Sequence, residues 1–340
     1  MHMSDALVSP AVGVSMLAVS GAALAYSIFK TKRENVLDDK TVPVMGVMSA
    51  FIFAAQMINF TIPGTGSSGH IGGGILLAAL LGAFPGLISI TAVLLIQCLF
   101  FADGGLLALG CNIFNMGVVS CLIAYPLIFK PILKKGITKP RLMIASVLSV
   151  VFGLQLGAFS VVLETLASGI TALPFGSFVL LMQPIHLAIG LVEGLVTGAV
   201  LIFVHQARPE LLASVQRATR LDRAVSVKKV VIGVLIAAIL VAGGLSIFAS
   251  THPDGLEWSI GKVTGVEELQ ASGPVYTLAE WIQSKTAILQ DYSTGAKSEA
   301  ALTSAAGLIG GGIVLALAAG TAFAISRTKK KNHESESTKE

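Results

Sequence analysis

The sequence is short of charged side chains and of cysteine, and both shortages limit what the chain can be. Only 12% of its 340 residues are charged, whereas 54% are hydrophobic and the mean hydropathy is +0.82. A soluble protein of this length needs far more polar surface. The three cysteines, Cys98, Cys111 and Cys121, lie in apolar segments without paired spacing, which favours buried thiols over disulfides or metal ligands.

Several functional signals are also missing. No Walker A motif is present, so we expect no ATP hydrolysis through a P-loop of the chain's own. The run around Ser68 is not G-x-S-x-G, because His70 stands where the second glycine belongs. The opening residues MHMSDALVSP contain no Lys or Arg, and we therefore expect no cleavable signal peptide. The net charge of +4 gives no indication of nucleic-acid binding.

The sequence does contain long apolar runs separated by short charged links. About 20 apolar residues cross a hydrocarbon core roughly 30 Å thick, and backbone groups in lipid must be bonded within a helix. The prediction is an all-α polytopic transmembrane bundle of about nine helices. Their expected ranges are 11–29, 42–60, 71–83, 85–101, 107–129, 142–167, 182–206, 229–250 and 304–326.

The distribution of positive charge predicts the orientation. With the N-terminus outside, the cytoplasmic segments are 30–41, 130–141, 206–229 and 327–340, and they hold all but three of the Lys and Arg residues. The exceptions, Lys262, Lys285 and Lys297, lie in one long outer loop. Cytoplasmic loops are the positive ones. We therefore expect a multi-pass protein of the cell (inner) membrane with a cytoplasmic C-terminus.

Composition also predicts a division of the chain. Residues 1–206 form a seven-helix core with short loops, and a basic cytoplasmic linker follows at 207–228. Residues 229–326 are two helices around a polar outer loop, 251–303, like an accessory subunit fused to the core. The tail 327–340 is low in complexity, and we expect it to be disordered.

Two outer segments offer metal ligands. A free α-amine followed by His chelates a divalent ion through the Met1 amine, the deprotonated His2 backbone nitrogen and the His2 imidazole, which lie in one plane. His70, in the loop TIPGTGSSGHIGGG, would complete a square. Four planar nitrogens select Ni(II) or Cu(II) and accept Co(II). Binding displaces protons, so affinity should fall at low pH. The alternative is that His70 only satisfies a backbone carbonyl.

Other polar residues are weaker candidates. Four of them could support the site through hydrogen bonds, namely Asp5, Ser68, Asn112 and Asn115. Asp103, in the sequence FADGG, is interpreted as a turn former. Glu164, His186 and Glu193 are ionisable groups at membrane depth, where such residues tend to be functional. His186 and Glu193 are seven residues apart and share a helix face; the alternative is a structural hydrogen bond between helices.

Several segments resemble one known family. The start MHMSDALVSP is similar to the MHIPDGFLSP-type start of the CbiM/NikM family, the substrate-capture subunits of energy-coupling factor cobalt and nickel transporters. The runs GTGSSGHIGGGILLAALLGAFPG, LLIQCLFFADGGLLALGCNIFNMGVV and HLAIGLVEGLVTG resemble its core, over about residues 1–206. HPDGLEWS resembles the PDGLE (NikN-like) accessory module. The sequence departs from the usual start in having Ser4-Asp5-Ala6 where Pro-Asp-Gly is typical.

The resemblance implies a function. The family binds its metal through its first two residues and a loop histidine, which correspond here to Met1, His2 and His70. It implies capture of Ni(II) or Co(II) outside and import driven by partners, namely a transmembrane coupling (T) subunit and cytosolic ATPases. The chain itself would then be a transport subunit and no enzyme. The alternatives are a stand-alone secondary permease and a membrane-embedded hydrolase.

Overall fold

A computed structural model describes residues 1–34, 37, 40–217, 226–292 and 299–337. Most of the described chain is helical, and its strands form one two-stranded antiparallel hairpin in which Thr61 pairs with Ser68. The all-α prediction is therefore confirmed. The predicted positions of Arg220, Arg223, Lys297 and Lys339 lie outside the described residues.

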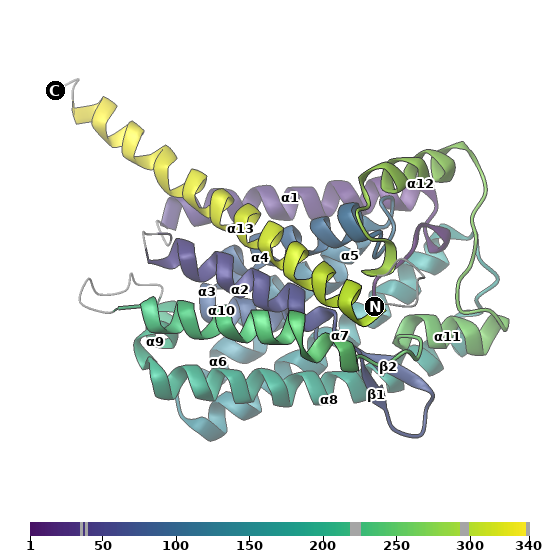
Figure 1. The fold of residues 1–340 in the computed structure, drawn as a ribbon, viewed down its shortest axis with the longest axis horizontal. Helices are drawn as coiled ribbons and strands as arrows, with labels where there is room; N and C mark the ends of the chain where they lie inside the picture. The colour runs from purple at the N-terminus through teal and green to yellow at the C-terminus, as the bar shows by residue number, and fades with distance from the viewer. Residues whose placement is uncertain (35–36, 38–39, 218–225, 293–298, 338–340) are drawn as a thin grey trace.

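The main helices run roughly parallel to the long axis of the molecule (Figure 1). In chain order they are α1 (Pro10–Glu34), α2 (Thr41–Gln56), α3 (Gly74–Leu81), α4 (Ala83–Ile96) with its continuation η2 (Gln97–Phe101), α5 (Leu109–Asn112) with the wider helix η3 (Ile113–Phe129), α6 (Lys130–Leu133), α7 (Lys139–Ser168), α8 (Phe175–Ala207), α9 (Pro209–Arg217), α10 (Lys228–Gly243) and α13 (Glu299–Ser337). The shorter elements are η1 (Asp5–Leu7), β1 (Phe60–Ile62), β2 (Ser67–Gly69), η4 (Leu245–Phe248), α11 (Gly255–Thr264), α12 (Pro274–Thr286) and η5 (Gln290–Tyr292).

Each of the nine expected helices has a counterpart, but their lengths differ. Six described helical stretches are long and apolar enough to cross a membrane: Pro10–Glu34, Ala83–Phe101, Leu109–Leu133, Lys139–Ser168, Phe175–Ala207 and Leu302–Arg327. The helix α3 has only 8 residues, too few to span a bilayer alone. The predicted count of nine is thus an approximate one.

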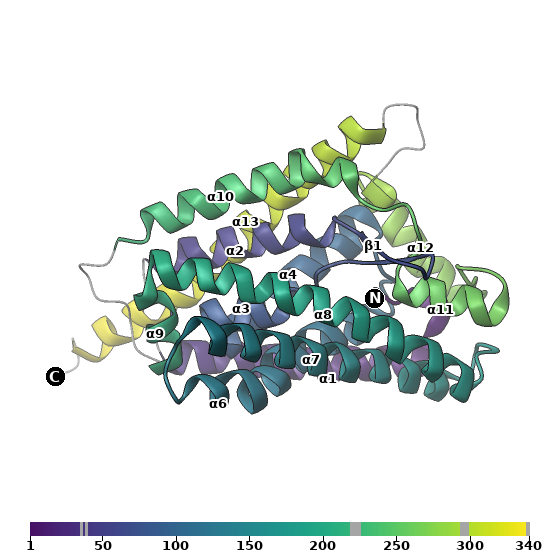
Figure 2. The ribbon, with the colours of Figure 1, turned by 90° about the horizontal axis from the view of Figure 1, so that it is seen from below.

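The two ends of the bundle carry different parts of the chain. The N-terminus, the β1–β2 hairpin, α11 and α12 gather at one end, and α9 and the C-terminus lie at the other (Figures 1 and 2). Met1 and His70 therefore share an end, as the sequence predicts. Which end faces the cell exterior stays a prediction from the positive charges.

The C-terminal tail and the linker between the two parts of the chain differ from expectation. The helix α13 continues to Ser337, so most of the tail predicted to be disordered is helical, and residues 338–340 are outside the described chain. Lys, Arg and Glu form helices well, and no Pro or Gly interrupts this segment. The predicted linker contains the helix α9, whose Leu211 and Leu212 are buried in the core.

The packing of α1 against α5 depends on one glycine. A Cβ atom at Gly110 would lie 2.2 Å from the backbone nitrogen of Leu17, closer than any real contact. The same close approach lets the Ser20 hydroxyl donate a hydrogen bond to the Gly110 carbonyl at 2.6 Å. Small residues allow transmembrane helices to approach in this way.

We therefore expect Gly110→Ala to separate α1 from α5 and to destabilise the protein by about 1–3 kcal/mol, the usual cost of overpacking. Gly21→Ala is the matched control, because a Cβ atom at Gly21 meets nothing within 4 Å. Thermal unfolding of the two purified variants in detergent measures the difference. Equal unfolding midpoints for both variants would contradict this account of the packing.

Candidate metal centre

The first residues of the chain are fixed to the bundle through Met3. The Met3 N–H donates to the Asn112 side-chain oxygen at 2.8 Å, and the Asn112 amide donates to the Met3 carbonyl at 3.1 Å. The Gly105 N–H donates to the same carbonyl at 2.9 Å. Asp5 Oδ1 accepts a hydrogen bond from the Ala108 N–H at 3.0 Å. These hydrogen bonds fix the backbone of the N-terminal segment against the bundle.

The N-terminal segment ends among the helices rather than on the surface. Met1 is only 5% exposed. A Cβ atom at Gly157 of α7 would lie 3.2 Å from the methyl carbon of the Met1 side chain. Gly157 is eleven residues from the end of α7 at Ser168, a depth of about 16 Å at the rise of an α-helix. Nonhelical backbone is tolerated at such a depth when it is buried in protein.

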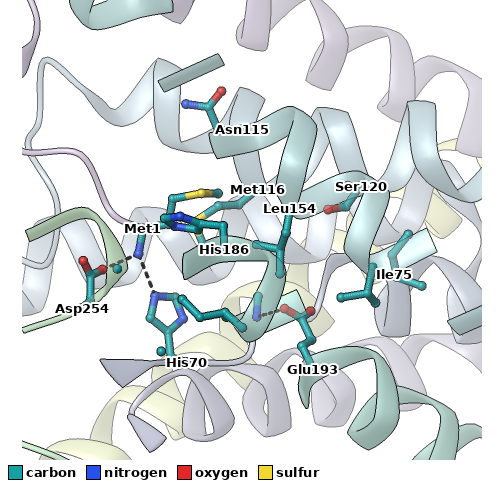
Figure 3. Close-up of a pocket in the computed structure, with 16 residues that line it drawn as sticks. Met1, His70, Ile75, Asn115, Met116, Ser120, Leu154, His186, Glu193 and Asp254 are labelled. Atoms are coloured by element: carbon teal, nitrogen blue, oxygen red, sulfur yellow. Dashed lines mark hydrogen bonds and ion pairs between the residues drawn. The ribbon is translucent and has the colours of Figure 1, made fainter. Parts of the chain in front are cut away.

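The α-amine of Met1 meets two side chains from distant parts of the chain. It lies 3.1 Å from His70 Nε2 and forms an ion pair with Asp254 (Figure 3). The other ring nitrogen, His70 Nδ1, faces the Ile71 carbonyl at 3.4 Å, which places the ring hydrogen on Nδ1. The lone pair of Nε2 therefore points to the amine. An imidazole held by a backbone carbonyl in this way is typical of a metal ligand.

The imidazole of His2 packs beside that of His70. The ring centroids are 5.0 Å apart and the planes differ by 15°. His2 Nδ1 lies 3.2 Å from Asp103 Oδ1, whereas His2 Nε2 has no hydrogen-bond partner in the described part of the chain. Burial lowers the pKa of His2, and it lowers the pKa of His70 well below the usual value, with the nearby amine adding to this effect. Both rings are therefore neutral near pH 7, the form that binds metals.

Asp254 connects the accessory segment to the amine. Its Oδ1 accepts hydrogen bonds from the N–H groups of Leu256 and Glu257 at 2.7 and 3.0 Å, which caps the start of α11, while Oδ2 pairs with Met1. Burial alone would raise the pKa of Asp254, but the Met1 ammonium and His70 outweigh it and hold the pKa below its ordinary value. The carboxylate is therefore charged, and it is the counter-ion of the N-terminus.

The loop that carries His70 is held by Glu193 of α8. The two oxygens of Glu193 accept hydrogen bonds from the N–H groups of Gly72 and Gly73 at 2.9 and 2.8 Å. On the other side, the Gln56 amide donates to the Gly72 carbonyl at 2.8 Å. Glu193 is 3% exposed, so its two oxygens are satisfied by these backbone donors and not by water. It fixes the backbone two residues after His70.

Ser68 docks the accessory segment onto the hairpin. Its hydroxyl donates to the His252 carbonyl at 2.7 Å, and its N–H donates to the Pro253 carbonyl at 2.8 Å. Next to Asp254, Gly255 lies against α8, where a Cβ atom would be 3.1 Å from His186 Cε1. A larger residue at position 255 would require His186 or its neighbours to shift. Residues 252–255 thus lie directly over the N-terminus.

The structure brings the three predicted ligands together and distributes the predicted supporting residues differently. Asn112 anchors Met3, and Asp5 anchors the 106–108 turn instead of contacting a histidine. Asp103, interpreted as a turn former, is the carboxylate that contacts His2. Asn115 donates to Glu164 at 2.7 Å, and its amide nitrogen lies 3.7 Å from the sulfur of Met3 in the N-terminal segment.

Asp254 is the residue that sequence reasoning missed, and its place in the motif run HPDGLEWS was the signal that could have pointed to it. Glu193 was a candidate because it is ionisable at membrane depth, but its contact with the loop of His70 was not predicted. Among the described residues no group of three or more His, Cys, Asp or Glu side chains is arranged to hold a metal ion. The predicted chelate does not need one, because two of its nitrogens belong to the backbone.

The apolar helices define a class, a multi-pass membrane protein, and its buried N-terminal amine beside two imidazoles is a set of nitrogen donors suited to a metal ion. The comparisons with known proteins identify the family. Residues 2–211 match the model of the CbiM cobalt uptake substrate-specific transmembrane region, and residues 228–327 match the PDGLE domain. The chain belongs to the CbiM family and carries a PDGLE domain behind the CbiM region.

Named relatives agree with this assignment. A putative fused nickel transport protein NikMN from Archaeoglobus fulgidus is 32% identical, over 96% of this chain and 98% of the relative. The cobalt transport protein CbiM of Geobacter sulfurreducens is 28% identical over 63% of this chain and 62% of its own length. The crystal structure of a truncated transition metal transporter is 30% identical and superimposes with a TM-score of 0.54, over 61% of this chain and 99% of that chain.

Replacing the carboxyl group of Glu193 by an amide should shift the position of His70. Glu193→Gln replaces one acceptor by an N–H donor, which then faces a backbone N–H. We expect metal affinity to fall about 10- to 100-fold, as for other groups that orient a ligand, and stability to fall by about 1–3 kcal/mol. Metal titration and thermal unfolding measure both effects. Glu210→Gln, at an exposed position of α9, is the control, and identical metal titrations for the two variants would contradict the assigned role.

Removing the charge of Asp254 should release the N-terminus from its position. Asp254→Asn leaves the buried Met1 ammonium without a counter-ion, and breaking a buried ion pair costs about 3–5 kcal/mol. We expect a lower unfolding midpoint and, because the amine leaves the site, weaker metal binding. The exposed Glu268 provides the control Glu268→Gln. An Asp254→Asn protein as stable as that control would show that the ion pair does not hold the segment.

Proposed function

We propose that the chain is the substrate-binding membrane subunit of an energy-coupling factor importer and that it captures Ni(II) or Co(II) at its outer face. The observation that carries the proposal is the convergence of the Met1 amine on His70 Nε2, 3.1 Å away, with the His2 ring stacked beside it. Ni(II) is the first ion to test, because the relative similar over nearly the whole chain is named as a nickel transport protein.

The donors of the proposed site are nitrogens only. They are the Met1 amine, the His2 backbone nitrogen, the His2 imidazole and His70 Nε2. The nitrogen of His2 that closes a small chelate ring with its own backbone is Nδ1, and in the structure this atom faces Asp103 Oδ1 at 3.2 Å. Binding therefore requires the His2 ring to turn from Asp103 to the ion. The set of four nitrogens in a plane discriminates against Mg²⁺ and Ca²⁺, which prefer oxygen.

Charge balance supports this mode of binding. Before binding, the Met1 ammonium is neutralised by Asp254. An ion that forms the chelate displaces one proton from the ammonium and one from the His2 N–H, so two positive charges leave as two arrive. The buried site keeps one net positive charge, and Asp254 compensates it in both states. A site that stays neutral avoids the cost of burying an uncompensated charge.

Import of the ion needs a source of energy, and the sequence contains no Walker A motif for ATP hydrolysis. We propose that a transmembrane coupling subunit and cytosolic ATPases provide it, with the N-terminus outside and the C-terminus in the cytoplasm. The arrangement of the bundle supports this orientation: the proposed site lies at the end opposite to α9 and to the C-terminus. The proposed subunit boundaries are 1–206 for the capture core, 207–228 for the linker and 229–326 for the accessory module.

The decisive test is to extend the N-terminus. Adding a few residues before Met1 turns the amine into an amide, which cannot serve as a neutral amine donor, and lengthens a segment that is 5% exposed. We expect tight Ni(II) binding and uptake to be lost, and His2→Ala and His70→Ala to have the same effect. Binding is measured by equilibrium dialysis with elemental analysis, using a histidine-free tag at the C-terminus.

The same number of residues added after Glu340 is the control for the extension, and it should leave binding intact. A permease or a hydrolase without the chelate should tolerate the N-terminal extension as well. If the extended protein binds one Ni(II) as tightly as the native chain does, the chelate is wrong. A bound ion that is Zn(II) and lacks the absorption of square-planar Ni(II) would also contradict the proposal.

A further inference from the structure

A small cavity lies between the N-terminus and the transmembrane helices. Its volume is about 20 Å³, and the residues that line it include Met1, His70, Asn115, His186, Glu193 and Asp254 (Figure 3). A space of this size accommodates one water molecule, and so a single ion of similar size. One wall of the cavity belongs to the proposed chelate, and the opposite wall belongs to α8 and η3.

The imidazole of His186 presents an unused lone pair in this wall. His186 is 1% exposed, and its Nδ1 lies 2.8 Å from the Met182 carbonyl. Because a carbonyl only accepts hydrogen bonds, Nδ1 carries the hydrogen and Nε2 carries the lone pair. His186 Nε2 is buried and has no hydrogen-bond partner in the described chain. A buried polar atom without a partner is costly and calls for an explanation.

The other polar groups around the cavity are mostly engaged. Glu193 accepts two backbone hydrogen bonds, and Asp254 pairs with Met1 and caps α11. The amide nitrogen of Asn115 donates to Glu164, but Asn115 Oδ1 is buried without a partner, like His186 Nε2. Two neutral donor atoms, from α8 and η3, are therefore left without partners around one ion-sized space. An imidazole whose Nδ1 is fixed by a carbonyl is a typical ligand of Ni(II) and Co(II).

We propose that this cavity is a second position for the cargo ion, in which His186 Nε2 is the ligand contributed by the transmembrane helix. The inference rests on the proposed function, because the ion reaches the cavity from the chelate. His70 lines the cavity and is also a ligand of the chelate. An ion that leaves the Met1 and His2 nitrogens can therefore keep His70 while it gains His186. During this exchange the ion always keeps at least one ligand. An ion without ligands in an apolar bundle would be very unfavourable in free energy.

The test uses the full chain in detergent with the chelate disabled. His2→Ala should lose tight Ni(II) binding but retain a weaker site for one ion at the cavity. In this background His186→Asn should weaken the residual binding at least tenfold, since Asn can still donate to the Met182 carbonyl but lacks the imidazole lone pair. His205→Asn is the matched control on α8, outside the cavity, and should change residual binding less than twofold. His186→Cys restores a metal donor and should recover most of it.

The outcomes separate the two proposals. If the His2→Ala protein binds Ni(II) as tightly as the native chain, the proposed chelate is wrong. The second position then falls with it, because no chelate delivers the ion to the cavity. If tight binding is lost and no residual site remains, or if His186→Asn and His205→Asn give equal residual affinities, the chelate stands and the second position is overturned. An equal loss with Asn and with Cys at position 186 also overturns it, because the effect would then come from packing.

Discussion

The ion pair between the Met1 ammonium and Asp254 is the interaction on which the rest of this structure depends. It is buried, and it joins the first residue of the chain, next to the CbiM region, to the N-cap of α11 in the PDGLE domain. In an environment with little water each charge would be strongly destabilised without the other. The pair therefore ties the position of the N-terminus to the docking of the accessory segment. The bonds from Ser68 to the carbonyls of His252 and Pro253 fix that docking beside the same point. The proposed metal site and the fused domain thus form one unit.

In the proposed mode of binding, the charge of Asp254 also determines which ions can replace the protons of the site. Because Asp254 supplies one fixed negative charge, the buried centre is neutral when it holds the Met1 ammonium and equally neutral when a divalent ion replaces two protons. A monovalent ion would leave it negative after the same deprotonation, and a trivalent ion would leave it positive. The low dielectric of the interior makes either imbalance expensive. In the proposed mode of binding, the charge of the cargo is selected by the counter-ion, and the choice among divalent ions is left to the nitrogen donors and their geometry.

The sequence predicts some levels of this structure and not others. Long apolar runs predict the helices, because lipid leaves the backbone no other partners. The adjacent residues Met1 and His2 suggest the proposed chelate directly, because their nitrogens are close together in the sequence. The partners of these residues are set by tertiary contacts. Asp254 lies more than 250 positions from Met1, and nothing in HPDGLEWS says which positive charge its carboxylate meets. The spacing of His186 and Glu193 predicts that they share one helix face. It does not predict that Glu193 accepts hydrogen bonds from the Gly72 and Gly73 N–H groups. Asp103 fits the pattern of a turn, and only the fold shows that it faces His2.

Glycine explains how so many segments reach one place. The chain has 36 glycines, and the sequence alone suggests only that they let helices pack closely. In the structure several of them make room for nonhelical chain instead. Gly157 leaves space for the Met1 side chain, Gly69 lets β2 lie against Ile189, and Gly255 lets the accessory segment pass over His186. A side chain at any of these positions would crowd the neighbouring helix and require the groups in contact with it to shift. The close packing that makes the bundle stable is therefore also the condition for placing an N-terminus, a loop and a fused domain around a space of about 20 Å³.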